Sequence, residues 1–185
     1  MTVRRLAAAD RVAAPWKNGG GLTWEIAADP PGAGLDDFGW RISMARVASA
    51  GPFSTFSGVD RIITILEGAL DLRLEGQGSR ILDPASDPFA FAGDDPCWGG
   101  PVEGAVLDLN VMTRRGRFRA EVRRLNGREP IRRDGDTLIL FALDEATIDG
   151  LTLKPHDAVI VDADVRITVE GSWPRLVAIA LMSVG

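Results

Sequence analysis

Three pairs of polar side chains stand at alternating positions inside otherwise apolar segments of the sequence. The pairs are Thr23 and Glu25, Arg41 and Ser43, and Asp108 and Asn110. Because side chains alternate between the two faces of a β-strand, the members of each pair share one face. Such faces either look at water, as in a half-buried antiparallel sheet, or line a polar cavity inside a barrel. The second interpretation supplies groups that could bind a ligand.

A glycine-rich segment lies directly before the first pair. Lys17 and Asn18 precede Gly19, Gly20 and Gly21. Glycine lets the backbone adopt positive φ and approach a ligand closely. The segment is not a phosphate-binding P-loop, because its lysine precedes the glycines and a strand pattern follows them. It is either a turn between strands or a ligand loop in which Lys17 and Asn18 offer a charge and an amide.

The charged members of these segments suit an acidic ligand. Lys17, Arg41 and Arg61 would place positive charge in such a cavity, and guanidinium and ammonium groups bind carboxylates well. Glu25 and Asp108 could bind an amine, orient the arginines, or act as acid and base.

The sequence offers few ligands for a metal ion. His156 is the only histidine and Cys97 the only cysteine, whereas metal sites in small barrels need several converging ligands. We therefore expect neither a metal nor another cofactor. His156 is interpreted as a loop residue and Cys97 as a structural thiol. A single cysteine excludes an intramolecular disulfide, which favours a reducing compartment.

Composition narrows the class of protein. The chain has 185 residues, a formal net charge of −5 and a pI of about 4.9. This length fits one compact domain or two small fused barrels, and the acidic balance argues against a nucleic-acid partner. No apolar run reaches the roughly 18 residues of a membrane span, and the first residues lack the apolar core of a signal peptide. We expect a cytoplasmic protein with no membrane partner.

Short apolar or alternating runs separated by Gly, Pro, Asp and Asn predict an all-β chain. Glu67-Gly68 is interpreted as a hairpin turn, and one helical turn is expected within residues 3–11. Many short strands with few helices favour a barrel or a sandwich. The predicted strands are 22–27, 40–47, 61–66, 69–74, 105–112, 137–142, 158–161, 165–169 and 176–181.

A weak internal repeat relates residues 82–112 to residues 153–182. Each stretch has a Leu-x-Pro element, a β run, a Val-Glu-Gly step and a strand that ends at methionine. The order of features matches while the spacing differs, so the repeat reflects either duplication or chance similarity. A boundary between two half-units would fall in the arginine-rich, strand-poor stretch 119–133.

Five segments together resemble the signature of the HutD family, also called the Ves family. They are residues 16–26, 40–45, 51–54, 58–61 and 108–112. The resemblance implies a bicupin fold, with two cupin-like (RmlC-like jelly-roll) β-barrels in one compact chain. We expect the first barrel at 1–118 and the second at 119–185. Many cupins bind metal through His-x-His and a later histidine, a pattern that this sequence lacks.

The same resemblance implies a role in histidine utilisation and the binding of a small pathway metabolite, with N-formyl-glutamate a favoured candidate. The principal hypothesis is therefore a binding protein for a small acidic metabolite that modulates this pathway. The expected ligand-binding residues are Lys17, Asn18, Gly19, Gly20, Thr23, Glu25, Arg41, Ser43, Arg61, Asp108 and Asn110.

Two alternatives stay open. A metal-free cupin enzyme, an isomerase or hydrolase, would use Glu25 or Asp108 as general base and Lys17 or Arg41 for electrostatic stabilisation. A protein-interaction module is the third hypothesis, although the sequence shows no amphipathic helix or basic tail for it. A homodimer is compatible with all three.

Overall fold

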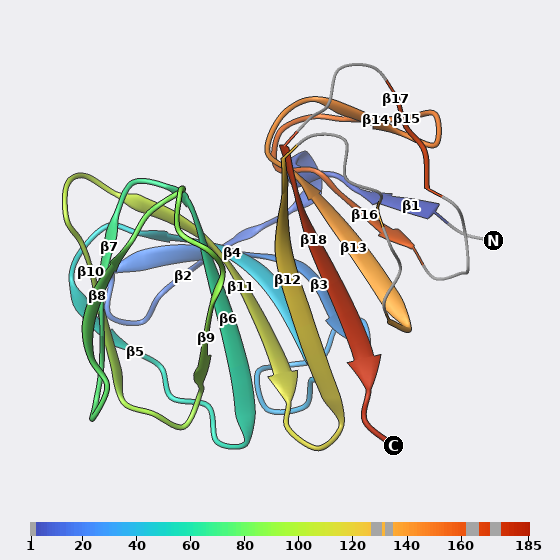
Figure 1. Cartoon of the computed structure of the whole chain (residues 1–185). Helices are drawn as coiled ribbons and strands as arrows, with labels where there is room; N and C mark the ends of the chain where they lie inside the picture. Colours follow the sequence, from blue (N-terminus) through green and yellow to red (C-terminus); the bar gives the residue numbers. More distant parts are fainter. Residues whose placement is uncertain (1–2, 127–130, 132–134, 162–166, 171–174) are drawn as a thin grey trace. The chain divides into compact units, whose positions relative to one another are not determined.

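The computed structural model describes residues 3–126, 131, 135–161, 167–170 and 175–185 (Figure 1). Strands dominate this part of the chain, and the one helical element within it is a 3-10 turn, η1, at Ala8–Asp10. The predicted all-β class is confirmed. No helix among the described residues is long and apolar enough to cross a membrane.

The chain divides into two compact units. The N-terminal unit comprises residues 12–116, and the C-terminal unit comprises residues 117–185 together with residues 1–11. The first eleven residues join the C-terminal unit because strand β1 pairs with β16.

The N-terminal unit contains two antiparallel sheets (Figure 1). The larger sheet has the strand order β2 (Ala13–Pro15), β3 (Gly21–Asp29), β4 (Trp40–Val47), β11 (Val106–Arg114), β6 (Val59–Glu67) and β9 (Phe89–Ala92). The smaller sheet has the order β5 (Gly51–Phe53), β10 (Cys97–Pro101), β7 (Leu70–Leu74) and β8 (Gly78–Leu82).

The C-terminal unit also contains two sheets. The larger has the order β1 (Val3–Leu6), β16 (Ala158–Val161), β13 (Thr137–Ala142), β18 (Arg175–Ser183) and β12 (Phe118–Asn126). The smaller has the order β15 (Leu151–Leu153), β14 (Ala146–Ile148) and β17 (Val169–Glu170). In the described part of the chain every sheet keeps two edge strands, so none closes into a barrel.

The order of strand pairing recurs between the units. The series β9-β6-β11-β4 of the N-terminal unit corresponds to β16-β13-β18-β12 of the C-terminal unit. The series β8-β7-β10 corresponds in the same way to β15-β14-β17. This agreement supports the internal repeat read from the sequence, because the two matched stretches run from the end of β8 into β11 and from the end of β15 into β18.

Each unit buries its own apolar core. In the N-terminal unit, Ile65 of β6 packs with Leu70 and Leu72 of β7, and each is at most 2% exposed. In the C-terminal unit, Leu140 of β13 and Val159 of β16 are fully buried. Burying one such side chain stabilises the fold by roughly 1.5–3 kcal/mol, so these contacts hold the sheets against which any site is built.

The predicted hairpin at Glu67-Gly68 is wrong. Strands β6 and β7 belong to different sheets, and this turn carries the chain from one sheet to the other. Gly68 has a φ of 77°. A Cβ atom at this position would lie 2.8 Å from the carbonyl oxygen of Ala105. Both the left-handed backbone and the close approach therefore require glycine.

The expectation of a strand-poor stretch at 119–133 is also wrong, because β12 occupies residues 118–126. Half-buried Ala120 and Val122 alternate with exposed Arg119 and Glu121, which is the period-2 pattern of a strand. Residues 127–130 and 132–134 lie outside the described residues. So do residues 165 and 166 of the predicted strand 165–169, of which Val169 begins β17.

Replacing Gly68 by alanine is expected to destabilise the protein more than replacing Gly76. Both glycines have positive φ, but a Cβ at Gly76 would meet nothing within 4 Å. Each variant should lose about 1–2 kcal/mol for the left-handed backbone, and Gly68→Ala should lose a further 1–3 kcal/mol, roughly, for overpacking. Urea unfolding of both variants measures the difference. Equal losses would contradict the assigned role of Gly68.

Candidate functional site

The N-terminal unit contains a cavity of about 650 Å³ that is partly open to solvent. Eight of the eleven residues expected to bind a ligand line it: Lys17, Asn18, Thr23, Arg41, Ser43, Arg61, Asp108 and Asn110. Gly19, Gly20 and Glu25 are not among the lining residues. The remaining wall is mostly apolar and includes Trp16, Leu35, Phe53, Phe56, Ile63 and Met112.

Strand register explains why residues so far apart in sequence meet. On β11, Asn110 pairs with Ser43 of β4 and Ile63 of β6, and Met112 pairs with Arg41 and Arg61. Directly paired residues of neighbouring strands point to the same face. The polar pairs predicted from the sequence therefore share one face of one sheet, and that face lines the cavity.

Arg61 lies deep in this cavity and is 7% exposed. Its guanidinium carbon is 6.0 Å from the ring centre of Phe53, 5.6 Å from that of Phe56 and 5.0 Å from that of Phe91. The ring faces attract the cation but accept no strong hydrogen bond from it. Burial lowers the pKa of Arg61, while Cys97 and Asp108 act in the opposite direction. The three phenylalanines thus hold a buried positive charge in one place.

Two buried polar atoms on the cavity wall lack a hydrogen-bond partner among the residues that the structure describes. Arg61 donates from Nη1 to the Ser54 carbonyl oxygen at 3.2 Å, but its Nε is buried and unpaired. The side-chain oxygen Oδ1 of Asn110 is likewise buried and unpaired. Leaving such a group without a partner costs about 1–3 kcal/mol. A ligand with an acceptor for Arg61 and a donor for Asn110 would remove both penalties.

Asp108 is the one acidic residue of the cavity wall and is 3% exposed. Its direct neighbours on the adjacent strands are Ala45 of β4 and Ile65 of β6, and their side chains offer the carboxylate nothing polar. Burial raises the pKa of Asp108 to about 7, against the opposing effect of the Arg61 charge. The carboxyl group therefore changes its protonation near neutral pH.

Glu25 lies outside the cavity and acts through Arg41. Arg41 donates from Nε to Glu25 Oε2 at 2.9 Å and from Nη1 to Ser43 Oγ at 3.3 Å. Strand β2 pairs with β3 only from Leu22 to Trp24, so Glu25 has no neighbour on that side and its side chain is 40% exposed. The structure makes Glu25 an orienting partner of Arg41.

The glycine-rich segment forms a loop that carries Lys17 and Asn18 to the cavity. Asn18 Oδ1 accepts a hydrogen bond from the Gly20 backbone N–H at 3.0 Å, and Gly19 has a φ of 70°. Trp16 donates from Nε1 to Thr23 Oγ1 at 2.7 Å. Gly19, Gly20 and the Asn18 side-chain oxygen thus shape the loop, and Lys17 and Asn18 are lining residues of the cavity.

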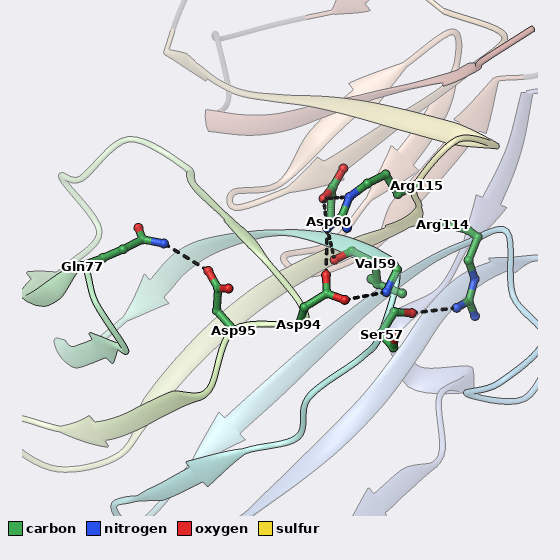
Figure 2. Close-up of polar contacts among 9 residues, drawn as sticks. Ser57, Val59, Asp60, Gln77, Asp94, Asp95, Arg114 and Arg115 are labelled. Atoms are coloured by element: carbon green, nitrogen blue, oxygen red, sulfur yellow. Dashed lines mark hydrogen bonds and ion pairs between the residues drawn. The ribbon is translucent and has the colours of Figure 1, made fainter.

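A network of charges outside the cavity fixes the start of β6, which carries Arg61 (Figure 2). Arg115 donates from Nη2 to Asp60 Oδ1 at 2.7 Å and to Asp94 Oδ2 at 2.9 Å. Asp94 also accepts a hydrogen bond from the Gly58 N–H at 2.9 Å. That bond and Arg115 keep the pKa of Asp94 below its ordinary value. Gly58 and Asp60 therefore position β6.

His156 and Cys97 are not cavity-lining residues. His156 belongs to the C-terminal unit and stacks on Phe141, with ring centres 5.8 Å apart. Cys97 is buried in the core of the N-terminal unit, and burial raises the pKa of its thiol. Among the described residues, no group of three or more His, Cys, Asp or Glu side chains could hold a metal ion.

The sequence interpretation assigned no role to the aromatic part of the wall. Phe53 and Phe56 were not expected at the site, although Phe53 lies in one of the segments that carry the family resemblance. An aromatic residue in a strand pattern usually signals core packing. Here both rings pack against a buried guanidinium as well, a contact that only the tertiary structure shows.

The cavity as a whole suits a small anion. Lys17, Arg41 and Arg61 bring three positive groups to its wall. The acids near them are Asp108 in the wall and Glu25, which is ion-paired with Arg41. Charges at the buried end of the cavity, where Arg61 and Asp108 lie, interact more strongly than charges at the surface. The arrangement can therefore orient a small molecule through a carboxylate, with the apolar wall packing against its carbon atoms.

Comparison with known sequences gives a consistent family. A sequence model of the HutD family matches residues 8–176. A Pseudomonas putida protein, described as an uncharacterized 21.2 kDa protein in the hutC 3' region, is 44% identical over 138 residues, which are 74% of this chain and 72% of that protein. Protein Ves of Citrobacter koseri is 46% identical over 110 residues, 58% of this chain and 56% of the relative.

Solved structures agree with the sequences. HutD from Pseudomonas fluorescens SBW25 has a TM-score of 0.88 at 34% identity, with both chains covered completely. A conserved protein of unknown function from Pseudomonas aeruginosa PAO1 has a TM-score of 0.84 at 34% identity, covering 99% of this chain and 100% of that one. The Escherichia coli pirin solved with nickel(II) has a TM-score of 0.68 at 10% identity over both full chains, a likeness of fold alone.

Asp108 should make the stability of the protein depend on pH. Its pKa is about 7 in the folded protein and 3.8 ordinarily, so between these values the folded state retains a proton that the unfolded chain releases. Stability then falls as the pH rises towards 7. Relative to Asp108→Asn, the wild type should lose about 2 kcal/mol of unfolding free energy between pH 5.5 and pH 8.

Urea unfolding of both proteins at the two pH values gives this difference directly. Comparison with the isosteric variant cancels the contributions of the other titrating groups. Parallel pH profiles would mean that Asp108 titrates at an ordinary pH and that its burial has little effect on its charge.

Proposed function

Because this chain belongs to the HutD family, we propose that its N-terminal cavity binds a small acidic metabolite and that the bound protein modulates histidine utilisation. N-formyl-glutamate is the first candidate ligand. The family is linked to histidine utilisation, and the Pseudomonas putida relative is named for its position in the hutC 3' region. This link supports the proposed role in histidine utilisation. The chemistry of the cavity supports the proposed class of ligand, a small acidic metabolite.

The observation that carries the proposal is the buried Arg61 with an unpaired Nε. A buried cation is costly unless an anion or hydrogen-bond acceptors compensate it. The phenylalanine rings supply part of the compensation, and the Ser54 carbonyl satisfies one nitrogen. A ligand carboxylate placed on Nε would supply the rest through a charge-assisted hydrogen bond.

The neighbouring groups extend this match. The unpaired Oδ1 of Asn110 would accept a hydrogen bond from an amide N–H, such as that of an N-acyl amino acid. Lys17 lines the same cavity and could bind a second carboxylate, whereas Arg41 is already paired with Glu25. A dicarboxylate that bears an N–H could thus bind Arg61, Asn110 and Lys17 together.

A metal-free enzyme is the second candidate function, and the pKa of Asp108 favours it. A general base works best when its pKa lies near the operating pH, and burial brings that of Asp108 to about 7. NMR observation of N-formyl-glutamate and urocanate incubated with the protein tests this function. Turnover that is lost in Asp108→Asn while binding persists would establish it, and no turnover of either compound would argue for binding alone.

The proposal for the fold is a bicupin in which each unit forms one cupin-like jelly-roll barrel. The recurrence of the strand-pairing order between the units supports it. On this proposal, the cavity described above is the interior of the first barrel. The N-terminal strand β1 would then belong to the second barrel, whose sheet it joins.

Replacing Arg61 by methionine is expected to weaken the binding of N-formyl-L-glutamate at least 100-fold. Methionine keeps much of the apolar volume and removes the charge that holds the carboxylate. Arg46→Met is the matched control, because Arg46 is exposed on β4 and is not a lining residue of the cavity. Isothermal titration calorimetry gives both affinities, and circular dichroism checks that each variant is folded.

A thermal-shift screen of histidine-pathway intermediates tests the ligand class more broadly. At a hundredfold excess over Kd, a ligand stabilises its protein by about 2.7 kcal/mol, which is readily visible. The proposal fails if no acidic intermediate shifts the wild type, or if Arg61→Met and Arg46→Met bind N-formyl-L-glutamate equally well.

A further inference from the structure

Asp108 occupies an unusual place for an acid in a cavity that suits anions. It is 3% exposed, it lies between Ala45 and Ile65 on the neighbouring strands, and its charged neighbour is Arg61. The positive charge of Arg61 offsets part of the cost of burying the Asp108 carboxylate. The ionised form of Asp108 therefore depends on Arg61.

An anionic ligand would disturb this balance. A carboxylate bound to Arg61 Nε would use the positive charge that stabilises ionised Asp108, and it would add a second negative charge close to that carboxylate. Two carboxylates that share one site cannot both remain ionised at low cost, and the affinity of one of them for a proton rises strongly. Asp108 is the more deeply buried of the two and is the one that would accept the proton.

We propose that the cavity binds its anionic ligand together with one proton, which Asp108 takes up from solvent. The inference rests on the proposed ligand-binding function and adds the coupling. The ligand anion, one proton and ionised Asp108 combine to a complex in which Asp108 is a neutral acid. The neutral acid has an O–H that can donate a hydrogen bond to a ligand oxygen. Protonation therefore replaces the repulsion between the two carboxylates with a hydrogen bond.

The other charged and titratable groups around Asp108 do not replace it as the proton acceptor. Lys17 from the β2–β3 loop and Arg41 from β4 line the same cavity, and both are cations at neutral pH. Glu25 is bonded to Arg41 and half exposed to solvent. Cys97 of β10 interacts with Arg61, and burial keeps its thiol protonated. Asp108 alone among the lining residues is an acid.

Thermodynamic linkage between proton binding and ligand binding gives the direction in which pH changes the affinity for the ligand. Above about pH 7 the free protein has ionised Asp108, so each binding event takes up close to one proton and the affinity falls nearly tenfold per pH unit. Well below pH 7 Asp108 already carries its proton, and the affinity becomes independent of pH. Asp108→Asn should bind with no proton uptake and should lose the pH dependence.

The test is calorimetric titration of N-formyl-L-glutamate at pH 8 in Tris and in HEPES, whose ionisation enthalpies differ. The difference in observed enthalpy gives the number of protons taken up. We expect close to one for the wild type and for Glu67→Gln, an exposed acid on β6 that is not a lining residue. We expect none for Asp108→Asn.

A ¹³C NMR titration of the side-chain carboxyl of Asp108 in the free protein, assigned from its loss in Asp108→Asn, completes the test. A midpoint near pH 7 supports the proposal, and a midpoint below pH 5 overturns it without any ligand. Binding without proton uptake, or uptake that persists in Asp108→Asn, overturns the coupling and leaves the proposed function intact. Absence of binding at every pH overturns both.

Discussion

The buried charge of Arg61 is the constraint on which the rest of the site depends. A guanidinium that is 7% exposed must be compensated, and the protein does so with phenylalanine rings, one carbonyl and a nearby acid. None of these satisfies Nε. The fit of an anion in the cavity follows from this incomplete compensation, and the same cation opposes the rise that burial causes in the pKa of Asp108.

The surrounding structure can be understood as support for that cation. The network of Arg115 with Asp60 and Asp94 fixes the start of β6, and the cross-strand pair Met112–Arg61 sets the depth at which the guanidinium enters the cavity. The glycine-rich loop brings Lys17 towards the same space. The residues of this loop that the sequence predicted as ligand-binding therefore fall into two groups. Gly20 shapes the loop, whereas Asn18 also lines the cavity.

Sequence reasoning recovers much of this arrangement, for identifiable physical reasons. Alternation along strands is strictly local, so the shared face of Arg41 with Ser43 and of Asp108 with Asn110 could be predicted. Whether that face meets water or a cavity depends on distant packing, which a period of two does not encode. The same limit explains the error at Glu67-Gly68, because the turn there joins two different sheets. It also explains the error at β12, where arginines obscure the alternation of half-buried and exposed residues. The three phenylalanine rings around Arg61 come from separate strands and loops. No local sequence pattern predicts that they meet.

A crystal structure grown with N-formyl-L-glutamate would test the central claim most directly. We expect one ligand carboxylate within hydrogen-bond distance of Arg61 Nε, the ligand N–H donating to Asn110 Oδ1, and a ligand oxygen beside Asp108. A ligand seated only at the exposed Arg41–Glu25 pair, with Arg61 Nε still unpaired, would contradict the claim that the buried cation defines the site.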